Sequence, residues 1–168
     1  EQAPLSRAYL AILDRAFNAT RVHGNMAITC LQRMSYPDVP AELADLILRV
    51  SGIDHCLAMG VYEGQIYLSL RTSERRVNAG RLMQRMVGPW GGAGGHEMIA
   101  GGRVEAGELG RPIRTIQREL VQRACAALGV QGARTVPLLG GGQAEEARAR
   151  RESLCGRRAK APRPARRS

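Results

Sequence analysis

The clearest periodic pattern in the chain lies between Asp38 and Gly52. Its large apolar residues recur at i, i+3, i+4 and i+7, the spacing of one helix face; they are Leu43, Leu46, Ile47 and Val50. Asp38 and Pro40 are typical of a helix start, and Gly52 of a helix end. The pattern therefore predicts a helix that buries one face against a core.

Three further segments have helical periodicity: residues 4–19, which Pro4 opens; residues 74–87, which Thr72 or Ser73 can cap; and residues 113–129. Four segments read as strands instead, because apolar and polar residues alternate in them or because they are rich in β-branched residues. They are residues 22–31, 53–62, 65–71 and a short stretch near 102–106. Glu63-Gly64 has the spacing of a hairpin turn between the second and third of these.

Helices that alternate with strands predict an α/β fold, here a single domain with a mixed β-sheet flanked by helices. We expect residues 1–20 to form a connecting helix packed on the domain and residues 21–129 to form the domain itself. Residues 130–168 are rich in Arg, Ala, Pro and Gly and are expected to be a disordered basic C-terminal tail. Residues 145–168 alone hold six of the ten net positive charges.

The length of 168 residues suits one domain with a real core. No apolar run approaches the ~20 residues that span a membrane, and the N-terminus has no signal-peptide pattern. The four cysteines are far apart and form no CxxC pair, which predicts reduced thiols in a cytoplasmic protein. The chain begins at Glu1 rather than methionine, which suggests a fragment or a processed product.

The glycine-rich stretch 88–96 is the first candidate for chemistry. A dense glycine cluster can expose backbone amides to an anion, and His96 directly follows it. A helical turn over 97–100 would place His96 at a helix N-terminus, where anions bind well. We therefore expect a ligand loop, and the alternative is a mobile surface loop. Trp90 would be a lid over the ligand or a plug under the loop.

Arg71 is the second candidate, because it ends a strand on the face away from the inferred core. A strand end and a glycine-rich loop that converge on one cleft form a common ligand site in open α/β sheets, and a guanidinium suits phosphate oxygens. Asp54, His55 and Cys56 resemble an acid–base–nucleophile run. However, consecutive strand residues point to alternate faces, so we assign these three a structural role.

Two motifs together resemble the C-terminal DHH-associated domain of the DHH phosphoesterases. The family has an S-x-R-S/T strand ahead of a G-G-G-H-x-x-A-G loop. This chain has Ser69-Leu70-Arg71-Thr72, then a helix, and then Gly91-Gly92-Ala93-Gly94-Gly95-His96-Glu97-Met98-Ile99-Ala100-Gly101-Gly102. The similarity covers roughly residues 5–128, and Ala93 interrupts the glycines. The resemblance implies a substrate-binding role for Ser69, Arg71, Thr72, Gly91, Gly92, Gly94, Gly95 and His96.

Members of that family look like two-lobed, manganese-dependent hydrolases of phosphodiester or phosphoanhydride bonds. The resemblance implies that this chain is the substrate-binding lobe of such an enzyme. Its substrate would be a nucleotide or a short single-stranded nucleic acid, with oligoribonuclease, cyclic-dinucleotide and adenosine-bisphosphate activities all open. Manganese would be bound by a DHH domain upstream of Glu1, because this chain has no Asp-x-Asp or Asp-His-His motif. We therefore expect no hydrolysis by this chain alone.

Two other functions stay open at this stage. The chain could be a non-catalytic nucleic-acid-binding module whose affinity comes from the basic tail through counterion release. The tail could equally be an inert linker. A homodimer is compatible with the sequence, and no membrane partner is expected.

Overall fold

A seven-stranded mixed sheet organises the computed structural model, which describes residues 6–140. The strand order is β5-β6-β4-β3-β2-β1-β7. Only β2 and β3 pair in parallel, and every other neighbouring pair is antiparallel. The strands are β1 (Arg21–His23), β2 (Met26–Leu31), β3 (His55–Tyr62), β4 (Gln65–Thr72), β5 (Gly91–His96), β6 (Ile99–Val104) and β7 (Thr135–Pro137). The α/β class and the mixed sheet predicted from the sequence are confirmed.

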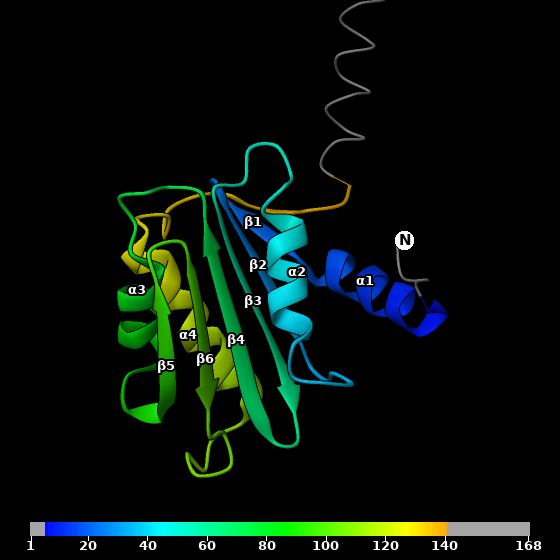
Figure 1. Cartoon of the computed structure of the whole chain (residues 1–168), viewed down its shortest axis with the longest axis vertical. Coiled ribbons are helices and arrows are strands. Elements are labelled where there is room, and N and C mark those ends of the chain that lie inside the picture. The colour runs from blue at the N-terminus through cyan, green and yellow to red at the C-terminus, as the bar shows by residue number, and fades with distance from the viewer. Residues whose placement is uncertain (1–5, 141–168) are drawn as a thin grey trace, which may run out of the picture. The chain divides into compact units, whose positions relative to one another are not determined.

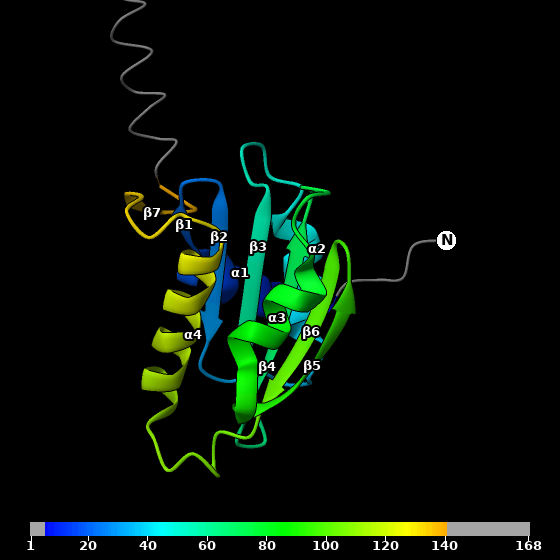
Figure 2. The same ribbon diagram turned by 90° about the vertical axis from the view of Figure 1, so that its left-hand side faces the viewer.

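Helices cover the two faces of the sheet in different places. The helices α1 (Arg7–Ala19) and α2 (Val39–Ile47) pack on one face, and α3 (Ala79–Val87) and α4 (Ile113–Ala127) pack on the other (Figures 1 and 2). In Figure 1, α2 lies in front of the sheet at β3, whereas no helix lies in front of β5 and β6. We call the side of β4, β6 and β5 that faces away from α3 and α4 the open face; the start of α2 borders it at β4.

Two hydrophobic clusters, one on each side of the sheet, hold these layers together. The larger cluster joins β2, β3, β4 and β6 to α3 and α4, through buried residues such as Leu57, Met83 and Leu120. The smaller cluster joins β2 and β3 to α1 and α2, through residues such as Ala16, Leu43 and Cys56. Burial on this scale is the main favourable contribution to folding. No helix within residues 6–140 is long and apolar enough to cross a membrane.

Several predicted elements are confirmed with small shifts of their ends. The helix predicted over 113–129 is α4, and the one predicted to begin near Pro40 is α2. The Glu63-Gly64 turn forms with φ of 48° and 77°, both in the left-handed region, as a tight hairpin between β3 and β4 requires. The helix predicted over 4–19 is observed from Arg7, where the Ser6 side chain caps it, and Pro4 lies outside the described residues.

Three boundary predictions are wrong. Residues 22–31 are not one strand, because Gly24 takes a φ of 62° and turns the chain back between β1 and β2. The helix predicted over 74–87 begins only at Ala79, because Asn78 rather than Thr72 or Ser73 caps it by accepting a hydrogen bond from the Arg81 amide at 2.9 Å.

The third wrong boundary is Gly129, after which the sequence predicts disorder. Residues 135–137 form β7 and pair with β1, and the Leu138 amide donates a hydrogen bond to the Thr20 carbonyl at 3.1 Å. The compact unit that holds the sheet therefore reaches Leu138. The remainder of the predicted tail, residues 141–168, lies outside the described residues.

Candidate functional site

The glycine-rich stretch is a strand rather than a loop. Residues 91–96 form β5, the edge strand that pairs with β6 in register from Gly91–Val104 to His96–Ile99. Residues 97–98 form the turn of this hairpin. The Glu97 carbonyl accepts a hydrogen bond from the Ala79 amide, and the Met98 carbonyl accepts one from the Thr72 amide. The expected helical turn over 97–100 is therefore wrong. His96 ends a strand and does not start a helix.

The glycines of β5 fall into two groups according to the sheet face. On the covered side, a Cβ at Gly91 would collide with the Arg103 carbonyl, and one at Gly95 with the Ile99 carbonyl. Gly95 also has a φ of 146°, which side chains disfavour. These two glycines are explained by packing alone.

Gly92 and Gly94 belong to the second group, because a Cβ at either position would meet nothing within 4 Å. Pairing register places them on the open face beside Arg103 and Gly101 of β6. Ala93 lies between them and packs its methyl group against the larger cluster, on the covered side. The alanine at position 93, where the family motif has glycine, therefore adds no side chain to the open face.

The open face carries the second predicted motif as well. Ser69 and Arg71 of β4 pair with Gly101 and Ile99 of β6, so their side chains share the face with Gly92 and Gly94. His96 is exposed and shares the same face. The structure thus brings Ser69, Arg71, Gly92, Gly94 and His96 together on one side of the sheet.

Thr72 lies on the other side, with Gly91 and Gly95. Its side chain is buried, and its hydroxyl bonds to His55 Nδ1 at 2.9 Å and accepts from the Glu74 amide at 3.1 Å. Both hydrogen bonds of the Thr72 hydroxyl are therefore made to other residues of the domain. Burial lowers the pKa of His55, which keeps its ring neutral in this setting.

A groove of about 330 Å³ opens beside Arg71, between the start of α2 and strands β4 and β6. The chain just before and within α2 forms one wall, and the two strands form the other. It is lined by Pro37, Asp38, Pro40, Ala41, Tyr67, Leu68, Ser69, Arg71, Ile99, Ala100, Gly101 and Gly102. Its volume lies at the lower end of the range of small-molecule sites.

Two side chains orient the Arg71 guanidinium in this groove. Its Nε donates to Asp45 of α2 at 2.5 Å, and its Nη1 donates to the Ser69 hydroxyl at 2.7 Å. The Arg71 side chain is 11% exposed, whereas that of Asp45 is 62% exposed. None of the hydrogen bonds that Arg71 makes within residues 6–140 involves Nη2. The fixed guanidinium therefore keeps donor capacity for an anion in the groove.

Sequence reasoning missed Asp45 and the α2 wall of the groove. Asp45 lies on the exposed side of α2, 26 positions before Arg71, and nothing in its local pattern distinguishes it from a solvated helix carboxylate. Gly101 also lines the groove. It belongs to the glycine-rich family motif that begins at Gly91, so the motif could have identified it as a site residue.

Two other predictions can be compared with the structure. Trp90 packs against the larger cluster, and the Arg123 guanidinium stacks 3.9 Å from its ring centre, which agrees with a plug rather than a lid. Asp54, His55 and Cys56 have structural surroundings, as expected. Asp54 accepts from Asn25, and burial raises the pKa of Cys56 to about 12, which leaves it an unreactive thiol.

The described residues do not form a metal centre. Residues 6–140 hold no group of three or more His, Cys, Asp or Glu side chains that could bind an ion. Manganese therefore does not fit the part of the chain that the structure describes. Cys30, Cys56 and Cys125 are free thiols, and Cys155 lies outside the described range.

Comparison with known proteins gives a family match, a curated protein of similar sequence and solved structures at low identity. The model of the DHHA1 domain matches residues 25–128. An uncharacterised protein of Methanocaldococcus jannaschii is 28% identical over 108 residues, which cover 64% of this chain and 22% of that protein. This chain thus spans about a fifth of that relative.

Two solved structures align with this chain at low identity. An exopolyphosphatase-related protein from Bacteroides fragilis is 15% identical with a TM-score of 0.54, covering 72% of this chain and 35% of that one. RecJ from Thermus thermophilus, solved with Mg²⁺, is 16% identical with a TM-score of 0.49, covering 70% and 17%. At these identities the likeness to the Bacteroides protein supports the fold alone.

Proposed function

Because this chain belongs to the DHHA1 domain family, a family related to the DHH phosphoesterases, we propose that it is the substrate-binding lobe of such an enzyme. The groove beside Arg71 would hold a phosphate of a nucleotide or of a short single-stranded oligonucleotide. The observation that supports this most directly is the fixation of Arg71 by Asp45 and Ser69 at the wall of that groove.

In this proposal each residue of the open face has a distinct task. Arg71 donates from Nη2 to a phosphate oxygen, and Ser69 and Asp45 hold its guanidinium in place. Gly92, Gly94 and Gly101 leave a surface free of side chains, on which a ribose or base can lie close to the backbone. His96 is placed to donate to a second phosphate at the end of β5. Thr72, Gly91 and Gly95 support the strands from the covered side.

The reaction would be hydrolysis of a phosphodiester bond, and its metal chemistry would come from residues outside 6–140. Two-metal phosphoryl chemistry needs ions about 3.5–4 Å apart that share the phosphate. An upstream DHH domain that holds manganese is the proposed source. The substrate could be of the oligoribonucleotide, cyclic-dinucleotide or adenosine-bisphosphate type.

Titration calorimetry of the full chain tests the binding role. Adenosine 3′,5′-bisphosphate and a short oligoribonucleotide are titrated into wild type, Arg71→Gln and Arg49→Gln. Arg49 is exposed and does not line the groove, so this control removes the same charge elsewhere. We expect Arg71→Gln to weaken binding about tenfold or more, with Arg49→Gln close to wild type. Equal affinities for all three would contradict the proposal.

A truncation after Gly140 separates this function from binding by the basic C-terminal residues. If the truncation alone abolishes binding and the affinity falls steeply with salt, those residues are the binder and the groove is not. The cut is placed after Gly140 because β7 and Leu138 belong to the folded unit.

A further inference from the structure

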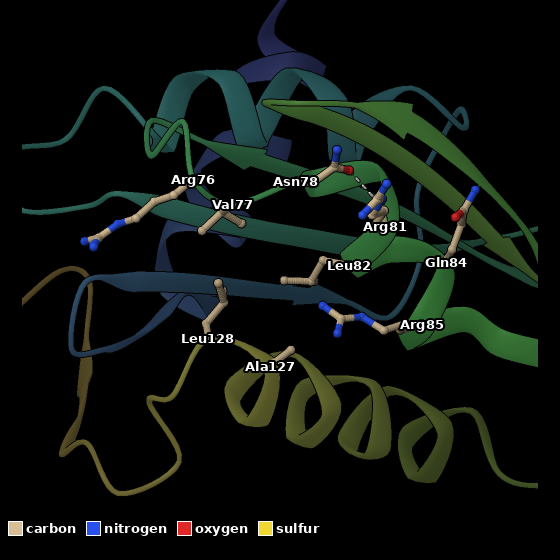
Figure 3. Close-up of a pocket in the computed structure, with 9 residues that line it drawn as sticks. All are labelled: Arg76, Val77, Asn78, Arg81, Leu82, Gln84, Arg85, Ala127 and Leu128. Carbon is tan, nitrogen blue, oxygen red and sulfur yellow. Dashed lines mark hydrogen bonds between the residues drawn. The ribbon is translucent and has the colours of Figure 1, made fainter.

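A second and larger groove lies on the opposite side of the sheet, between α3 and the end of α4 (Figure 3). Its volume is about 620 Å³, which falls within the range of small-molecule sites. It is lined by Arg76, Val77, Asn78, Arg81, Leu82, Gln84, Arg85, Ala127 and Leu128. None of these residues belongs to the family motifs or to the groove beside Arg71.

The lining of this α3–α4 groove is strongly positive. Three of its residues are arginines and none is acidic. Within residues 6–140, Arg81 and Arg85 form no ion pair, and Arg76 lies 3.3 Å from Glu74 with 87% of its own side chain exposed. Arg81 and Arg85 are four residues apart on α3, so their side chains lie on one helix face. Like charges at this spacing are unfavourable without a counter-charge.

The bottom of the groove is apolar. Leu82 is 2% exposed, and Val77 and Leu128 are partly buried against the larger cluster. Ala127 presents only a methyl group from α4. Figure 3 shows the Arg85 side chain in the space between the two helices. Arg81 and Arg85 thus lie on α3 next to an apolar surface, whereas the Arg76 side chain extends away from the space between the helices.

We propose that the α3–α4 groove binds a nucleotide, with its phosphates on Arg81 and Arg85 and its base or ribose against Val77 and Leu128. Planar guanidinium groups suit phosphate oxygens, and a group of phosphates supplies the negative charges that Arg81 and Arg85 do not receive from the described residues. The apolar floor favours a ligand with a flat, weakly polar part next to its charges, which a peptide of acidic residues alone does not have. The ligand is a free nucleotide or one nucleotide unit of a single strand. Since the groove shares no residue with the open face, this site stands independently of the proposed substrate site.

A site-resolved titration tests this proposal on the full chain. Amide ¹H–¹⁵N and arginine Nε–H signals are followed while ATP, hexathymidylate or hexaglutamate is added. We expect ATP or hexathymidylate to shift the signals of Arg81, Arg85 and Ala127, and to do so more than hexaglutamate. A response to ATP at low concentration identifies a free nucleotide, and a response to hexathymidylate alone identifies a strand. No shift at these signals with either nucleotide probe, or an equal shift with hexaglutamate, would overturn the proposal.

Matched variants separate a specific site from general charge. Arg81→Gln/Arg85→Gln removes two charges from the groove, and Arg7→Gln/Arg15→Gln removes two from the exposed side of α1. Ala127→Glu places a carboxylate in the groove, and Ala126→Glu places one at an exposed neighbour that does not line it. We expect the two groove variants to weaken binding about tenfold and the two controls to stay near wild type. Equal losses in groove and control variants would also overturn the proposal.

Discussion

Arg71 illustrates what the sequence predicts at the scale of one residue and what it omits. Its position at the outer face of a strand end follows from the alternation of β4, and that placement is confirmed. The partner that fixes its guanidinium, Asp45, comes from a different element and could not be predicted from local spacing. The contact between Asp45 and Arg71 depends on how α2 packs on the sheet. The hydrophobic periodicity of a sequence predicts helices and strands but not which residues of two such elements meet.

The charge of Asp45 opposes an anion that binds to Arg71. We expect Asp45→Asn to strengthen phosphate binding about threefold, because the amide oxygen can still accept from Nε while the negative charge is gone. The effect is measured by calorimetry at two salt concentrations, and it should shrink at high salt. Weaker binding by Asp45→Asn would mean that the full carboxylate is needed to orient the guanidinium.

Two adjacent glycines of β5 should respond in opposite ways to alanine. Gly95→Ala is expected to lower the free energy of unfolding by about 3 kcal/mol, because the methyl group meets the Ile99 carbonyl and the φ of 146° is unfavourable. Gly94→Ala should leave stability nearly unchanged and weaken ligand binding at the open face. Denaturant unfolding measures stability, and calorimetry measures binding. Equal losses of stability would contradict the assignment of these glycines to different faces.

At the scale of elements, the strongly periodic segments were predicted well and the glycine segment was not. The helix α4 and the β3–β4 hairpin have full apolar patterns, so their period alone identifies them. Residues 91–96 have almost no side chains and low strand propensity, so no period is visible. Their strand structure comes from pairing with β6 and from packing under α3, which are tertiary contacts.

Gly80 tests how closely α3 lies on β5. An alanine in a helix is ordinarily more favourable than glycine by about 1 kcal/mol. At Gly80 the added methyl group would collide with the Gly95 carbonyl, so we expect Gly80→Ala to destabilise the protein by about 2 kcal/mol instead. Thermal or denaturant unfolding decides the sign. A stabilised variant would mean that α3 and β5 are further apart than described.

The strand β7 gives a second prediction at this scale. Removing residues 130–168 deletes β7 and Leu138, which packs against the smaller cluster, whereas removing residues 141–168 keeps both. We therefore expect the longer deletion to lower the melting temperature more than the shorter one. Identical melting temperatures for the two deletions would show that β7 adds nothing to stability.

At the scale of the whole molecule, stability should depend on pH through His55. Burial lowers its folded-state pKa below the ordinary 6.5, so the unfolded chain binds the proton more readily. Stability is then full above pH 6.5 and falls as the pH drops below 6.5 towards the folded pKa. We expect His55→Gln to flatten this part of the curve of unfolding free energy against pH. An unchanged slope in the variant would assign the dependence to other groups.

The open face, together with the start of α2, is the proposed ligand site of the whole molecule. A crystal structure of the full chain with adenosine 3′,5′-bisphosphate tests this proposal. We expect a phosphate oxygen about 3 Å from Arg71 Nη2, with the nucleoside over Gly92, Gly94 or Gly101. A ligand bound elsewhere, with Arg71 still held only by Asp45 and Ser69, would contradict it.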